Sequence, residues 1–173
     1  PKAPFDIDEI TARTMLTSTG NPNNRPNSDV VRPVASAIDL VRGSRGCWTI
    51  DFALMTMEEA AQYEAPFEYV KRVVKPAREK RRDDYRGCWW QYARPRPEMR
   101  SSLKGLSRFI ATPSVSKYRI FVWMNPEVLS NQGTLVFARS DDCFFGILHS
   151  RIHEVWARAQ GTQLREEISG ARY

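Results

Sequence analysis

Short runs of β-branched and aromatic side chains, separated by polar turns, predict strands at five places in the chain. The runs are Cys47–Phe52, Cys88–Ala93, Ser107–Thr112, Lys117–Trp123 and Thr134–Arg139. In the second run Trp89 and Trp90 would point to opposite faces, and the size of each ring favours the core. The segment Val34–Gly43 fits either a short helix or a strand edge.

Apolar residues at helical spacing predict helices between these runs. Thr56 is suited to cap a helix, because acidic residues follow it in the first turn. The next helix would place Phe67, Val70 and Val74 on one face, and Pro76 is expected to end or kink it. Residues 97–106 favour a further short helix, at the end of the extended break RPRP at residues 94–97.

The longest apolar-periodic segment lies near the C-terminus. Asp141 and Asp142 are expected to cap a helix over Cys143–Gln160, which Gly161 ends. By contrast, residues 1–29 are weakly patterned and are expected to form an irregular segment and loop, followed by one domain over residues 30–173. The predicted fold is mixed α/β (α+β), with a central, mostly antiparallel sheet, flanking helices and a long helix on the C-terminal side.

Composition narrows the class of protein. The 173 residues are 42% hydrophobic, enough for a packed core, and no run of 18 apolar residues occurs. We therefore expect a cytoplasmic chain without membrane contact, and three separated cysteines fit reduced thiols. Because Pro1 is not methionine, the chain is expected to be a piece of a longer polypeptide.

Positive charge is concentrated in the middle of the chain. Between Lys71 and Arg119 there are fifteen basic and four acidic residues, a net +11, while the remaining residues carry −5 of the total +6. Such a distribution is typical of proteins that bind nucleic-acid phosphates. A helical face crossed by salt bridges would have the same composition, so this alternative stays open.

Motifs for enzyme chemistry are missing. There is no P-loop, GxSxG or cofactor-binding glycine loop. His149 and His153 could share a helical face, but the sequence indicates no third metal ligand. Asp83, Asp84 or Glu98 could serve a metal-dependent nuclease, although no acidic-x-Lys pair accompanies them. A nuclease fragment and a protein-docking module therefore remain the alternatives to nucleic-acid binding.

Two basic side chains in one predicted strand have a spacing that would let both contact DNA bases. Lys117 and Arg119 are two residues apart, so they would leave the same face of the strand. Arginine can grip the O6 and N7 edge of guanine with two hydrogen bonds. A strand whose solvent-facing side happens to be basic would explain this spacing equally well.

Several long segments carry a family resemblance. They are RPNSDVVRP, WTIDF, YEAPFEYVKRVVKPAR, the pair WW, GLSRFIATPSVSKYRIFVW and FARSDDCFFGILHSRIHEVWA, in this order. Residues 10–173 thereby resemble the target recognition domain of MmeI-like (type IIL) restriction–modification enzymes, which are class I S-adenosylmethionine-dependent DNA methyltransferases.

The resemblance implies a division of labour. The longer enzyme would methylate adenine in double-stranded DNA, with S-adenosylmethionine in a separate catalytic domain of the same polypeptide, whereas this chain would hold neither cofactor nor metal and have no activity alone. The base readers would be Lys117 and Arg119, with Asn27 and Ser28 as weaker candidates. The DNA backbone contacts would be Arg94, Arg96, Arg100, Lys104 and Arg108.

Overall fold

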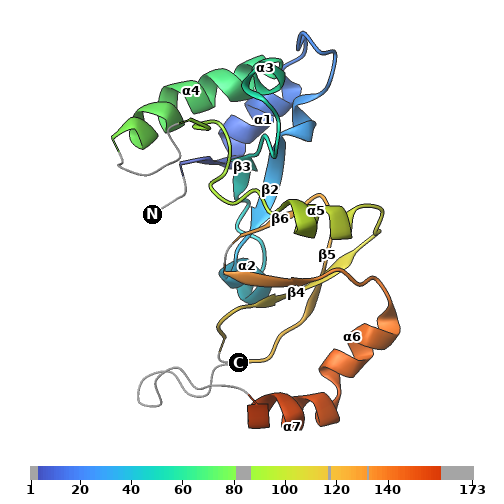
Figure 1. Ribbon diagram of the computed structural model, residues 1–173. Coiled ribbons are helices and arrows are strands. Elements are labelled where there is room, and N and C mark those ends of the chain that lie inside the picture. The colour runs from blue at the N-terminus through green and yellow to red at the C-terminus, as the bar shows by residue number, and fades with distance from the viewer. Residues whose placement is uncertain (1–3, 81–86, 117, 132, 161–173) are drawn as a thin grey trace. The chain divides into compact units, whose positions relative to one another are not determined.

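The computed structural model describes residues 4–80, 87–116, 118–131 and 133–160, which form two compact units (Figure 1). The first unit comprises residues 1–34 and 46–97, and the second comprises residues 35–45 and 98–173. The mixed α/β class is confirmed, because each unit combines antiparallel strand pairs with helices. No helix within the described ranges is both long enough and apolar enough to cross a membrane.

The first unit contains most of the N-terminal half of the chain. Its elements are β1 (Asp6–Ile7), α1 (Glu9–Thr17), the 3-10 helix η1 (Asn27–Asp29), β2 (Val31–Ala35), β3 (Trp48–Ile50), α3 (Met57–Ala61) and α4 (Glu64–Glu79). The strand β3 lies between β1 and β2 and pairs antiparallel with both. The prediction that residues 1–29 are irregular is therefore wrong for α1, whose first turn Asp8 caps. The assignment of residues 30–173 to one recognition domain stays a prediction.

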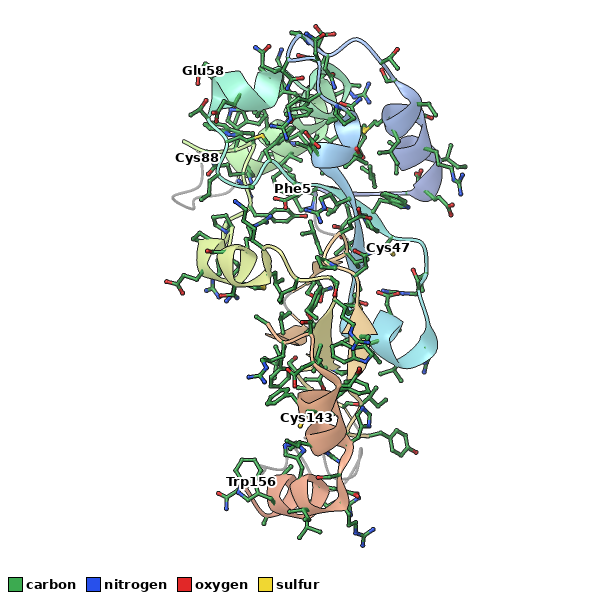
Figure 2. All side chains as sticks on the ribbon, turned by 90° about the vertical axis from the view of Figure 1, so that its right-hand side faces the viewer. Phe5, Cys47, Glu58, Cys88, Cys143 and Trp156 are labelled. Atoms are coloured by element: carbon green, nitrogen blue, oxygen red, sulfur yellow. The ribbon has the colours of Figure 1, made fainter. Side chains whose placement is uncertain are left out.

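Helix α4 carries one side of the core of the first unit. Its Phe67, Val70 and Val74 are buried, as their spacing predicts, and they pack with Phe5, which Figure 2 labels. Of the two alternatives predicted for Pro76, an end of the helix is wrong, since α4 continues to Glu79, and a kink stays a prediction. A proline inside a helix removes a single backbone hydrogen-bond donor. The buried side chains of Phe67, Val70 and Val74 precede Pro76 and stabilise the helix by packing into the core.

The two adjacent tryptophans reach the core without forming a strand. Residues 87–90 are in turns, so the strand predicted at Cys88–Ala93 is wrong. Trp89 is 8% exposed and packs against Phe67, while the indole N–H of Trp90 donates to the Met55 carbonyl at 2.9 Å. Packing of the two large rings determines where this segment lies, and its backbone forms turns instead of a strand.

The second unit is built around the antiparallel sheet β5-β4-β7. Its elements are α2 (Ala37–Arg42), α5 (Pro97–Leu103), β4 (Phe109–Pro113), β5 (Val122–Met124), β6 (Leu129–Ser130), β7 (Thr134–Phe137), α6 (Asp142–His149) and α7 (Arg151–Gln160). The last residue of β2, Ala35, also belongs to this unit, and its carbonyl accepts from the Asn131 N–H at 3.0 Å. The strand predicted at Lys117–Trp123 is shorter than expected, because regular pairing begins at Val122.

The long C-terminal helix is present but interrupted. Asp141 caps α6 by accepting from the Phe144 N–H, as predicted, and Ser150 then adopts an extended backbone with ψ near 152°. The Ser150 hydroxyl accepts from the His153 N–H at 3.1 Å and so begins α7. The apolar period continues across residues 143–160, whereas the backbone divides there into two helices.

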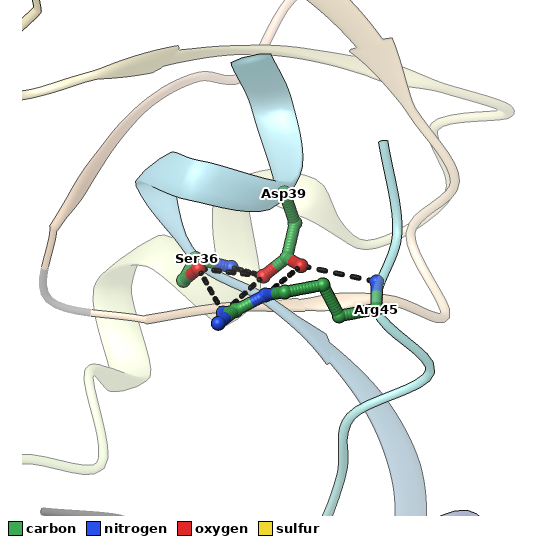
Figure 3. A network of polar contacts seen from close by, with 3 residues as sticks. All are labelled: Ser36, Asp39 and Arg45. Carbon is green, nitrogen blue, oxygen red and sulfur yellow. Dashed lines mark hydrogen bonds and ion pairs between the residues drawn. The ribbon is translucent and has the colours of Figure 1, made fainter. Parts of the chain in front are cut away.

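A small network of polar side chains, Ser36, Asp39 and Arg45, connects the start of α2 to the segment that follows this helix. Ser36 and Asp39 form a capping box, and the Arg45 guanidinium donates to both carboxylate oxygens of Asp39, at 2.8 and 3.2 Å (Figure 3). The Asp39 side chain is 4% exposed, and the Arg45 guanidinium holds the pKa of its carboxylate well below the usual range. The network connects the start of α2 to the segment that leads back toward β3.

This network predicts an acid-sensitive share of stability. Asp39→Asn should lower the free energy of unfolding by about 1–3 kcal/mol near neutral pH, because it removes charged hydrogen bonds to Arg45. Since the pKa of Asp39 is depressed in the folded state, its contribution is present above about pH 4 and fades as the pH falls. Urea unfolding at about pH 7 and about pH 3 should therefore show a smaller pH effect in Asp39→Asn than in the wild type. As a control, Glu68→Gln, in an exposed pair with Lys71, should change stability by less than about 0.5 kcal/mol.

Candidate nucleic-acid interface

The basic stretch, residues 71–119, contains two parts whose basic side chains differ in their ion-pair partners. On α4, Lys71 pairs with Glu68 at 3.0 Å and Lys75 approaches Glu79 at 4.0 Å. The same helix places the guanidinium of Arg72 over the ring of Tyr69. The salt-bridged helical face that charge alone could not exclude is therefore found on α4.

The following part, residues 94–104, has a different character. Arg94, Arg96 and Lys104 are exposed, and no described residue forms an ion pair or hydrogen bond with their side chains. Arg94 and Arg96 belong to the first unit and Lys104 to the second. These cations keep their full charge available for an anionic partner.

Arg96 also has an unusual backbone. The sequence predicts an extended conformation for it, because Pro97 follows, but its φ is +54°, in the left-handed region. Pro97 then begins α5, where a proline at the first helical position costs no hydrogen bond. The left-handed residue turns the chain sharply at the entrance to the helix.

Two of the five predicted backbone contacts are more enclosed. Arg100 is half-buried on α5. The Arg108 guanidinium donates to the Ser140 carbonyl and to Asp142, at 3.1 and 2.7 Å, and lies 3.9 Å from the ring centre of Trp123. Arg108 thus has a packing function in the second unit, whatever else it contacts.

Arg119 points into the fold. Its guanidinium donates to the carbonyls of Leu148 and Ser150 and contacts His153, where α6 ends and α7 begins. The Leu148 carbonyl lies in the last turn of α6, at the negative end of the helix dipole, which favours a cation. To read a base, Arg119 would have to leave these partners. Lys117 lies outside the described residues, so its proposed base contact stays a prediction.

The predicted site residues that belong to the second unit lie in different parts of it. Figure 1 shows α5, which precedes Lys104, at one end of the unit and α7, which adjoins Arg119, at the other, with the sheet between them. The proposed backbone contact and the proposed base reader are therefore not brought together in one cluster.

The two weaker candidates differ sharply in exposure. Asn27 is 1% exposed; its amide nitrogen donates to the Met15 carbonyl and its oxygen accepts from Asn21, both at 2.8 Å. Both ends of the amide are thus used inside the first unit, and this geometry supports a structural function rather than a DNA contact. Ser28, the next residue, is exposed.

The residues of the nuclease alternative are not assembled into a site. Asp83 and Asp84 lie outside the described residues, and Glu98 is exposed on α5. His149 ends α6 and His153 lies on α7, so the helical spacing expected of this pair is interrupted. In the described part of the chain, no group of three or more His, Cys, Asp or Glu residues could hold a metal ion.

The position of Tyr118 in the sequence already indicates that its side chain differs in direction from those of its neighbours. If Lys117 and Arg119 share a face, the residue between them must take the opposite one. The Tyr118 side chain is 60% exposed, in the connection between β4 and β5. Trp156 on α7, labelled in Figure 2, is equally exposed, whereas the other described tryptophans and tyrosines are buried or half-buried.

Comparison with known proteins finds a similarity of fold. The chain superposes on the solved structure of the type IIL restriction–modification enzyme MmeI in complex with DNA, with a TM-score of 0.68 and 16% sequence identity. The match covers 98% of this chain and 22% of the MmeI chain, so the chain spans less than a quarter of that protein. No protein-family model and no curated protein sequence matches the chain.

The contacts of Arg119 predict a loss of stability on substitution. Arg119→Ala should lower the free energy of unfolding by about 1–3 kcal/mol, because the carbonyls at the end of α6 lose a charged donor. Lys104→Ala, on an exposed side chain, should stay within about 0.5 kcal/mol of the wild type in the same urea titration. An Arg119→Ala protein as stable as the wild type would show that the guanidinium is free to leave the helix end.

Proposed function

We propose that this chain is a DNA target recognition domain, a module that holds double-stranded DNA for a catalytic domain of the same polypeptide. The observation that carries the proposal is the set of exposed cations without ion-pair partners among the described residues, Arg94, Arg96 and Lys104, in a segment of high positive charge. Phosphate groups are the natural partners of such cations. The fold similarity to MmeI, solved in complex with DNA, agrees with this proposal.

The proposal distinguishes cations that meet phosphates from cations that stabilise the fold. Arg94, Arg96 and Lys104 would contact the DNA backbone, and Arg100 would join them from its half-buried position. Arg108 would contribute mainly through its bonds to Ser140 and Asp142. Contacts of this kind position a protein on DNA and carry little sequence information.

The described residues do not fit S-adenosylmethionine. Nucleotide-type cofactors are commonly held at a glycine-rich turn between a strand and a helix. Each strand-to-helix connection among the described residues lacks glycine: Asp8, Ser36, residues 51–56 and residues 138–141. In the proposed enzyme, methylation of adenine would take place in a separate catalytic domain of the same polypeptide.

The protein-docking alternative finds its support on α7. Ile152, Val155 and Trp156 are between 57% and 83% exposed and lie at helical spacing, so they form an apolar face. In a DNA-binding module, such a face could serve the contact with the catalytic domain. An unrelated acidic protein partner would instead compete with DNA for the basic segment.

DNA binding by the isolated chain tests the proposal. We expect a dissociation constant of roughly 10⁻⁴–10⁻⁶ M for duplex DNA near physiological salt, with affinity falling steeply as salt is raised. Fluorescence anisotropy with a labelled duplex at several salt concentrations measures both quantities. Absence of binding at low ionic strength would contradict the proposed function.

Single substitutions then separate phosphate contacts from salt-bridged lysines. Lys104→Gln and Arg94→Gln should each reduce the slope of log affinity against log salt by about one unit, because each removes one phosphate contact. Lys71→Gln is the matched control, since Lys71 is already paired with Glu68, and its slope should stay close to that of the wild type. Equal effects of all three substitutions would argue for a diffuse electrostatic attraction instead of defined contacts.

A further inference from the structure

Alternate side chains of the segment leading into β5 pack against α6 and α7. Phe121 is 8% exposed and forms a small core with Leu148, and Trp123 stacks on Phe145 with ring centres 4.6 Å apart. The Arg119 guanidinium lies over the Phe121 ring at 5.6 Å. Residues 119, 121 and 123 therefore share one face, and that face is covered by helices.

Tyr118 leaves the segment on the other side. Its backbone N–H donates to the Ser116 hydroxyl at 3.2 Å, so a local turn holds the residue. Its ring is 60% exposed, and Val115 in the same connection is 43% exposed. The connection thus presents an aromatic ring and an aliphatic side chain to the solvent at the C-terminal end of the basic stretch.

We infer that Tyr118, rather than Arg119, is the residue of this connection that contacts DNA bases. The inference rests on the proposed function. In the major groove of duplex DNA an aromatic ring can pack against the methyl group of thymine, and a tyrosine hydroxyl can bond to a base edge or phosphate. The Tyr118 ring is already 60% exposed to the solvent, whereas a base contact by Arg119 would break its bonds to Leu148 and Ser150.

Substitution of Tyr118 should change DNA affinity without changing its salt dependence, unlike substitution of a basic residue. Tyr118→Ala removes the ring but no charge, so it should weaken binding to the preferred duplexes by roughly tenfold while the salt slope stays at the wild-type value. Tyr118→Phe keeps the ring and should bind within about twofold of the wild type. Lys104→Gln should show the opposite pattern, with a reduced slope.

The experiment uses the whole chain and a random-sequence duplex library. Wild type, Tyr118→Ala, Tyr118→Phe and Lys104→Gln are compared by anisotropy on the pooled DNA and by sequencing of the retained duplexes. A thermal melt of each protein checks the fold, which the exposed ring of Tyr118 should leave unchanged. We expect any base preference of the wild type to survive in Tyr118→Phe and to weaken in Tyr118→Ala.

The outcomes separate this inference from the proposed function. Wild-type binding with unchanged affinity and base preference in Tyr118→Ala would overturn the inference and leave the proposed function standing. An altered salt slope in Tyr118→Ala would also overturn it, because the ring would then act through the charges around it. Failure of the wild type to bind at low salt would remove the proposed function and, with it, this inference.

Discussion

The packing of one strand face onto α6 determines what the second unit can offer to a partner. Phe121 and Trp123 require an apolar cover, and α6 supplies it through Leu148 and Phe145. In the segment that leads into this face, the Arg119 guanidinium lies at the end of α6 and the Tyr118 side chain lies at the surface. The identity of the exposed side chain thus follows from a hydrophobic requirement several residues away, because a shift by one residue would exchange the two faces.

Elements with strong local signals could be predicted from the sequence. Thr56 forms its capping box with Glu59, and the stripe of Phe67, Val70 and Val74 is buried as its spacing indicates. The mixed fold could also be predicted, since strand-like and helix-like periods alternate along the chain. In these cases the residues that decide the structure lie within one or two turns of each other.

Features that depend on tertiary contacts escaped prediction. The period of residues 143–160 continues through Ser150, although serine is also a good first cap for a second helix. The tryptophan pair looked like a strand because side-chain type does not reveal which backbone will carry a ring to the core. Charge counts likewise could not separate Lys71, which has a partner one turn away, from Lys104, which has none among the described residues.

At position 96, the backbone conformation and the proposed DNA contact favour different residues. A residue with a side chain in the left-handed region costs roughly 1–2 kcal/mol relative to glycine, and the following proline restricts the backbone further. Glycine would relieve that cost but would remove a cation from the proposed DNA contact. Selection for a more stable domain and selection for tighter DNA binding would therefore favour different residues at position 96. Libraries screened for thermal stability alone would tend to discard the arginine, and with it the DNA contact proposed for this position.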